Sequence, residues 1–170
     1  GRLREGGIFM PATGELTVTD GAEVLYGELG CRREEWDTSR IGPFAFRPPA
    51  HPGRGIVSVA QELAKSGTFT GHYALHSMGS AVYSVLGLMK GAYAGYIANV
   101  KISDIGAGIP LLEKLGFVMK FSDGERMSGE ATAANFDIAP EAPKRWRVRT
   151  PLYIAADEAT CDDIRANAHL

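Results

Sequence analysis

The sequence predicts an α/β fold in which a layered, mixed β-sheet is flanked by helices. Short apolar runs bounded by turn residues alternate with segments of helical periodicity, and glycines follow the helical segments. With 170 residues, 45% apolar content and 22% charged content, the composition is typical of a soluble globular protein. This length is enough for one domain with a core, so we expect a single α/β domain over residues 1–170.

The N-terminal third combines predicted hairpins with a long loop. Residues 7–27 hold apolar or β-branched runs separated by turn residues at 11–14 and 20–21, which predicts a β-meander of hairpins. Residues 31–55 are charged at first and then rich in proline and glycine, which predicts a long loop.

The range 56–123 is predicted to form the core of the domain. Ser58 is a candidate N-cap of a short helix ending at Lys65. The further elements expected are a strand leading into a turn (67–80), a helix (80–90), a strand (92–102), a helix that ends at Gly116, and a strand with a turn (117–124).

The C-terminal part is predicted to contain a second loop, a strand and a helix. Residues 124–150 are loop-like, and RWRVR at 145–149 is a candidate edge strand with its alternating arginines on one solvated face. A last strand and helix are expected over 151–170, with Asp157 as the N-cap of the helix.

Charge and cysteine usage limit the classes of partner. The formal net charge of −2 provides no overall field that favours nucleic acid or an anionic membrane, and no apolar run approaches the ~20 residues that span a bilayer. The two cysteines, Cys31 and Cys161, lie far apart without a paired motif, which fits a reducing cytoplasm. No signal peptide is evident, and the first residue is Gly1 rather than Met, so we expect either processing or a piece of a longer protein.

Two short segments have the same form, MGSA at 78–81 and SDIGAG at 103–108, and each lies where a predicted strand ends and a helix begins. Exposed N–H groups and a partial positive charge make a helix N-terminus suitable for an anion such as phosphate. A nearby carboxylate such as Asp104 is a candidate ligand for Mg²⁺, which binds to carboxylates and phosphate oxygens. Plain helix capping by Ser103 and Asp104 is the alternative.

Pro110 bears on the role of Asp104. A helix that started at Asp104 would contain Pro110 in its interior, at a cost of roughly 3 kcal/mol. A start near Gly108 places Pro110 in the first turn, where proline is tolerated, and leaves Asp104 free on the approach to the helix.

Other candidate sites are weaker. His72 and His76 are four residues apart, but they fall in a predicted strand, where that spacing is about 13 Å and does not suit a shared metal. The sequence has no dinucleotide fingerprint, no P-loop and no nucleophile elbow.

Three segments share motifs with one family: GSA at 79–81, GAYAGYI at 91–97 and DIGAGIPLLEKLG at 104–116. They resemble the Gly-Ser/Thr-Ala turn, the Gly-x-x-x-x-Tyr strand and the Asp-x-x-x-Gly signature of the C-terminal half of the inositol monophosphatase family. Residues 7–27 and 151–170 are similar to its hairpin and to its last strand and helix. The resemblance implies the C-terminal lobe of a lithium-sensitive, Mg²⁺-dependent phosphatase.

The resemblance also implies residue roles. Asp104 matches the metal-binding aspartate that helps to activate the attacking water, and Gly79, Ser80 and Ala81 match the turn that contacts substrate. Lys101 lies three residues before Asp104, where it could either pair with the phosphate of a substrate or repel a metal ion. The implied reaction is hydrolysis of a small sugar or polyol phosphate by a water that Mg²⁺ activates.

The sequence departs from the family in ways that keep a second hypothesis open. The first metal-binding signature, Asp-Pro-Leu-Asp-Gly-Thr, is absent, so this chain alone is expected to have little activity. Ile97 stands in place of a substrate-binding glutamate, Ser103 in place of the usual tryptophan, and Lys114 in place of a helix glutamate. One hypothesis is therefore a hydrolase lobe that requires a missing N-terminal lobe or a homo-oligomer partner. The other is a divergent, non-catalytic protein that binds a phosphorylated ligand or a partner chain.

Overall fold

A computed structural model describes residues 1–48 and 53–170, and the part of the expected long loop at residues 49–52 lies outside the described residues. The first sheet has the strand order β1-β2-β3-β4 and is antiparallel throughout. Its strands are β1 (Gly7–Met10), β2 (Glu15–Asp20), β3 (Glu23–Glu28) and β4 (Gly42–Pro43). Two short 3-10 turns, η1 (Arg33–Glu35) and η2 (Thr38–Arg40), connect β3 to β4.

The second sheet is mixed and has the strand order β7-β5-β8-β10-β9. β5 runs parallel to both of its neighbours, whereas β10 runs antiparallel to β8 and β9. The strands are β5 (Ile56–Val59), β7 (Ala74–His76), β8 (Gly95–Ala98), β9 (Val118–Phe121) and β10 (Leu152–Ala155). The predicted α/β fold with a mixed sheet is therefore confirmed. A further pair, β6 (Thr68–Phe69) and β11 (Ala168–His169), lies outside both sheets.

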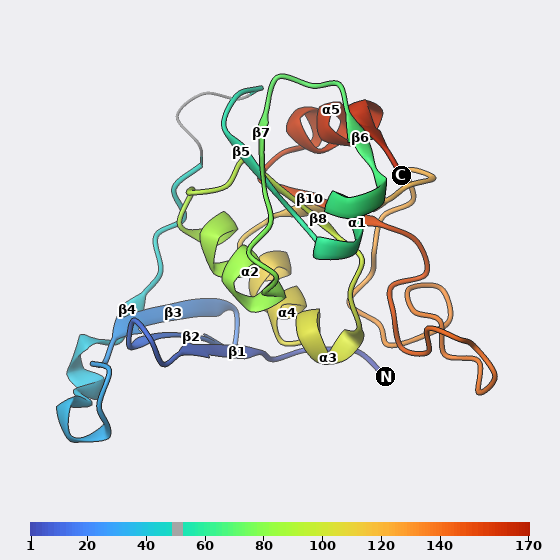
Figure 1. Cartoon of the computed structure of the whole chain (residues 1–170). Helices are drawn as coiled ribbons and strands as arrows, with labels where there is room; N and C mark the ends of the chain where they lie inside the picture. Colours follow the sequence, from blue (N-terminus) through green and yellow to red (C-terminus); the bar gives the residue numbers. More distant parts are fainter. Residues whose placement is uncertain (49–52) are drawn as a thin grey trace.

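The helices form two layers (Figure 1). Their bounds are α1 (Gln61–Ser66), α2 (Ala81–Met89), α3 (Ile102–Ile105), α4 (Gly108–Lys114) and α5 (Glu158–Asn167). α2 and α4 lie between the sheets, where one apolar cluster joins Ile8 of the first sheet to Tyr96 and Leu152 of the second. A second cluster, which includes Leu63 and Ile164, packs α1 and α5 against the other face of the five-stranded sheet.

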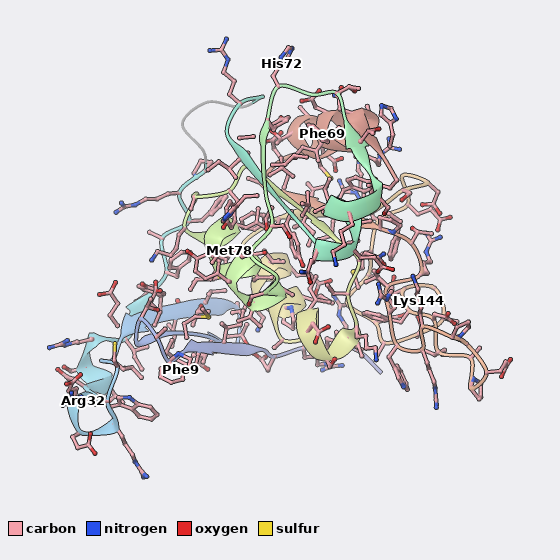
Figure 2. The ribbon with its side chains drawn as sticks, viewed as in Figure 1. Phe9, Arg32, Phe69, His72, Met78 and Lys144 are labelled. Atoms are coloured by element: carbon pink, nitrogen blue, oxygen red, sulfur yellow. The ribbon has the colours of Figure 1, made fainter. Side chains whose placement is uncertain are left out.

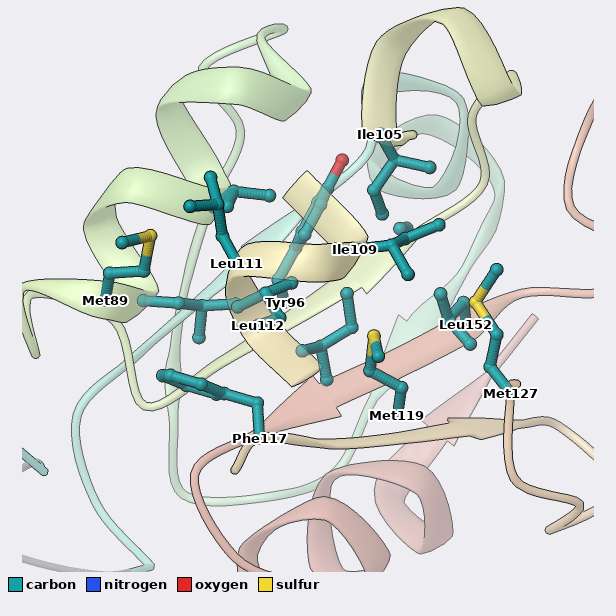
Figure 3. Close-up of a cluster of buried hydrophobic side chains, with 14 of the residues drawn as sticks. Met89, Tyr96, Ile105, Ile109, Leu111, Leu112, Phe117, Met119, Met127 and Leu152 are labelled. Atoms are coloured by element: carbon teal, nitrogen blue, oxygen red, sulfur yellow. The ribbon is translucent and has the colours of Figure 1, made fainter. Parts of the chain in front are cut away.

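The centre of the larger cluster is shown in Figure 3, where Ile109 and Leu112 of α4 lie against Met119 and Leu152 of the mixed sheet. All four side chains are at least 96% buried. None of the described helices combines the length and apolar character that crossing a membrane requires.

The outer face of the first sheet, defined by Phe9, Leu16, Val18 and Leu25, has no described helix over it (Figure 1). Leu25 pairs with Val18 across β2 and β3, and Leu16 pairs with Phe9 across β1 and β2. These four side chains are partly exposed, whereas their sequence neighbours point to the opposite face. Alternation therefore gives this sheet two apolar faces. The inner face is buried in the core, and the outer face is covered only in part, by Trp36 at Phe9 and by Arg40 and Ile41 at Gly27.

Several predicted element ends are confirmed. Ser80 caps α2, Asp157 caps α5 by accepting a hydrogen bond from the Thr160 N–H at 2.8 Å, and Gly116 follows α4 with a positive φ of 78°. The proposed cap at Ser58 is wrong. Ser58 is fully buried in β5 and its Oγ lies 2.8 Å from Ser84 Oγ, because the β-branched run at 56–59 extends the strand through this position.

The predicted edge strand at 145–149 is also wrong. The described chain forms only isolated bridges there, from Arg147 to Lys101 and from Val148 to Phe136. Trp146 has a φ of 68°, which interrupts the extended backbone that a strand requires. The alternating arginines consequently do not share a solvated face: Arg147 contacts Glu62, whereas Arg149 contacts Asp123.

The two cysteines are expected to differ in reactivity. Cys31 is exposed, whereas Cys161 is fully buried in α5, where burial raises the pKa of its thiol to about 11. We expect a thiol reagent such as Ellman's reagent to modify one thiol per native chain at neutral pH and two in denaturant. A Cys31→Ser variant that still reacts rapidly in its native state would contradict this assignment.

Candidate functional site

A pocket of about 530 Å³ opens where β5 and β8 end and α2 begins. Because β5 and β8 are parallel, their carboxyl ends meet at one edge of the sheet, where ligands bind in many α/β proteins. The predicted site residues all line this pocket, although they come from separate segments: Gly79, Ser80, Ala81, Lys101 and Asp104. The structure therefore brings the two helix-start segments together, while the roles of these residues remain predictions.

The turn before α2 is fixed by local hydrogen bonds. Gly79 has a φ of 70°, in the region that favours glycine, although a Cβ there would meet no neighbour. Ser80 Oγ accepts a hydrogen bond from the Tyr83 N–H at 3.3 Å, and Ser80 O accepts one from Ser84 Oγ at 2.9 Å. Ser84 in turn contacts Ser58 in β5, so the start of α2 is anchored to the sheet.

Asp104 lies in α3, a single helical turn that precedes α4. α4 begins at Gly108, which confirms that Pro110 lies in a first turn. Asp104 is not free, however, because its carboxylate accepts hydrogen bonds from the Lys101 N–H at 3.3 Å and from Ser103 Oγ at 3.2 Å. The capping interpretation holds only in part: Asp104 accepts the N–H of Lys101 from the third position of α3, whereas the N-cap itself is Lys101 and Ser103 lies inside the turn. A carboxylate has about four lone-pair sites, so these two contacts leave capacity for another ligand.

The opposite wall of the pocket carries a charged cluster that sequence reasoning missed. Glu62 of α1 forms ion pairs with Arg147 and with Lys144, whose Nζ lies 2.7 Å from Glu62 Oε1. Asn99 Nδ2 donates to the same carboxylate at 3.4 Å. Hydrogen bonds from Lys144 and then from Arg147 lower the pKa of Glu62, so its carboxylate is ionised at neutral pH.

The described residues do not form a complete metal site. No group of three or more His, Cys, Asp or Glu side chains in residues 1–48 and 53–170 is placed to hold a metal ion. Asp104 has the chemistry of a Mg²⁺ ligand, because Mg²⁺ takes one or two carboxylates and otherwise phosphate oxygens and waters, but the described residues supply no second carboxylate beside it. Glu62, the other carboxylate that lines the pocket, is already paired with the two cations Lys144 and Arg147.

The remaining candidate histidines lie away from the pocket. His76 Nδ1 is 2.9 Å from the Tyr93 hydroxyl, a contact between β7 and the chain that leads into β8. His72 lies in the bend before β7, at the top of the molecule as drawn in Figure 2. Neither His72 nor His76 lines the pocket.

Comparisons with known proteins place this geometry in a fold family. No protein-family model matches the chain, and no curated protein sequence matches it. Solved structures do match. Staphylococcal IMPase-II gives a TM-score of 0.63 at 10% identity over 96% of this chain and 55% of that chain. An inositol monophosphatase from Zymomonas mobilis gives a TM-score of 0.60 at 11% identity, over 96% of this chain and 56% of that chain.

A calcium-bound IMPase family protein from Staphylococcus aureus gives a TM-score of 0.50 at 14% identity over 91% of this chain and 56% of that chain. The chain thus has part of the inositol monophosphatase fold and spans about 55% of the length of the first matched structure. At these identities the similarity concerns the fold, and the calcium-bound structure shows that at least one protein with that fold binds a metal.

Proposed function

We propose that this chain is the C-terminal lobe of a Mg²⁺-dependent phosphomonoesterase of the inositol monophosphatase family, with a small sugar or polyol phosphate as substrate. The observation that supports the proposal is the pocket. It is lined by the four residues that the family resemblance implies, Gly79, Ser80, Ala81 and Asp104, and by Lys101, from two segments that are separate in sequence. A fold match over half the length of known phosphatases supports the same assignment.

The proposed roles follow from the chemistry of the pocket walls. The start of α2 at Gly79–Ala81 offers N–H groups and the positive end of the helix dipole to a phosphate. The Lys101 ammonium adds positive charge on the neighbouring wall, and Asp104 contributes one carboxylate to a shared Mg²⁺ ion. When bound, Mg²⁺ supplies charge neutralisation and a water of lowered pKa. The other metal ligands come from outside these residues, so the chain alone binds substrate and turns it over slowly.

A non-catalytic binding protein is the second candidate. It is favoured by the absence of a metal-binding group among the described residues. It is also favoured by Ile97, which is 1% exposed and packs in the cluster under α1 and α5. Such a protein would bind a phosphorylated ligand or a partner chain without metal.

Asp104→Asn tests the two candidates against each other. Using calorimetry with glycerol 3-phosphate as the probe, we expect wild-type chain to bind more tightly in magnesium chloride than in EDTA. Asp104→Asn is expected to lose this difference, a change of about tenfold or about 1.4 kcal/mol of binding free energy. Asp20→Asn, at the exposed end of β2, is the matched control.

The outcomes separate the candidates. Binding that is equal in magnesium and EDTA, and unchanged in Asp104→Asn, would exclude the metal role and favour the binding protein. No measurable binding in either condition would overturn the phosphatase assignment and the binding of a phosphorylated ligand, and would leave only binding of a partner chain.

A further inference from the structure

The segment that carries Arg147 is held against the pocket by backbone hydrogen bonds. The Ile102 N–H donates to Trp146 O at 2.8 Å, and the Val148 N–H donates to Val100 O at 3.0 Å. Between these bonds, Trp146 is the one non-glycine residue in the described chain with a positive φ. A bulky residue rarely adopts this conformation, and such strain persists where the surroundings fix it. Arg147 is thereby directed at the pocket by a defined backbone.

The Arg147 guanidinium is not saturated by its contacts. One terminal nitrogen pairs with Glu62 and donates to Asn99 O at 3.0 Å, while its Nε–H is buried without a partner among the described residues. The side chain is 23% exposed and lines the pocket. A guanidinium has five donors in a planar fork, so it can bind a carboxylate or phosphate with two parallel hydrogen bonds.

The charged cluster around Glu62 carries more cations than carboxylates. Arg147 and Lys144 share this one carboxylate, and Lys101 and Asp104 also line the pocket. These three cations and two carboxylates leave a net charge of +1. If Arg147 moved to another anion, Glu62 would keep Lys144 and Asn99 as partners. The exchange would therefore leave no buried charge unpaired.

We propose that Arg147 is a ligand-binding residue that recognises a second anionic group, and that the ligand is a phosphorylated compound with a carboxylate or a second phosphate. This rests on the proposed function, because the first phosphate is assigned to the start of α2 and Lys101. Glu62 holds the guanidinium in place while the pocket is empty and gives it up when the ligand binds. The pocket, at about 530 Å³, has room for a small ligand with two anionic ends.

A matched pair of probes tests the proposal. Glycerol 3-phosphate and 3-phosphoglycerate both carry a phosphate, and they differ mainly in a terminal hydroxymethyl group that is a carboxylate in the second compound. We expect the wild-type chain to bind 3-phosphoglycerate about 10–100-fold more tightly in calorimetry, the range expected for a charge-assisted, bidentate contact.

Substitutions then assign the preference to one side chain. Arg147→Gln is expected to remove the preference for 3-phosphoglycerate and to leave the affinity for glycerol 3-phosphate within about twofold. Arg149→Gln is the matched control, because Arg149 pairs with Asp123 and Glu125 instead of Glu62. Glu62→Gln is expected to act in the opposite direction and strengthen binding of 3-phosphoglycerate, because it frees the guanidinium.

The outcomes are distinguishable. Equal binding of the two probes, or a preference that survives in Arg147→Gln, would overturn this inference and leave the proposed function standing. A Glu62→Gln variant that melts like wild type but loses the preference would mean that the ion pair is structural, which also overturns the inference. No binding of either probe would overturn the proposed function together with the inference.

Discussion

Replacing Phe136 with alanine is expected to lower the free energy of unfolding by about 3–5 kcal/mol, the usual cost of removing a large aromatic side chain from a core. Phe136 is fully buried although it lies in the irregular range 124–150. Its N–H donates to Thr132 O at 2.9 Å, and it bridges to Val148. Met127 and Val148, from the same range, are buried in the same cluster, so truncation leaves a cavity at the point where this range attaches to the core.

Guanidinium chloride unfolding would measure this loss, with Phe9→Ala as the control. Phe9 is partly exposed on the outer face of the first sheet and contacts Trp36 edge to face at 5.3 Å between ring centroids. Its truncation removes less buried area, so it is expected to cost less. Equal losses in the two variants would show that the range 124–150 is not anchored through Phe136.

Val18→Lys is expected to weaken self-association of the chain by at least about tenfold. We propose that the outer face of the first sheet, Phe9, Leu16, Val18 and Leu25, packs against a second copy of this chain. Without such a cover, these partly exposed apolar side chains and the adjacent Trp36, which is 47% exposed, favour association. A lysine at the centre of that face would place a charge in the contact.

Sedimentation velocity over a range of concentrations would detect the change. We expect wild-type chain to form dimers or larger species, and Val18→Lys to raise the dissociation constant by at least about tenfold. Ala22→Lys adds the same charge in the exposed turn between β2 and β3 and is expected to have little effect. A wild-type chain that stays monomeric at the highest concentration would contradict the proposal for this face.

The features that depend on local chemistry could be predicted from the sequence. A serine before an apolar helical pattern, a proline near a helix start and a glycine after the helix each act within one turn. Ser80, Pro110 and Gly116 accordingly lie where expected. The alternation of strands and helices was enough to predict a mixed sheet, because it requires crossover connections between parallel strands.

The predictions that were wrong or missing concern features that depend on residues distant in sequence. Ser58 has the local pattern of a cap, but it lies in β5, where it is buried between β7 and β8. Arg147 has the local pattern of a strand, but the conformation of Trp146 and the pairing with residues 100–102 decide its position. No local pattern around Glu62 indicates a role at the pocket, because its partners Lys144 and Arg147 are separated from it by 82 and 85 residues. One sequence alone does not contain those pairings.

That separation has a kinetic consequence. The two walls of the pocket come from residues near positions 62, 80, 101 and 147, so their assembly requires closure of long loops of the chain. Contacts between distant residues form slowly, because the entropy of loop closure is lost before the contacts form. During synthesis, the helix start at Ser80 can form long before Arg147 leaves the ribosome. The capacity to discriminate between ligands is therefore acquired last, when the segment around Arg147 docks onto a sheet that is already in place.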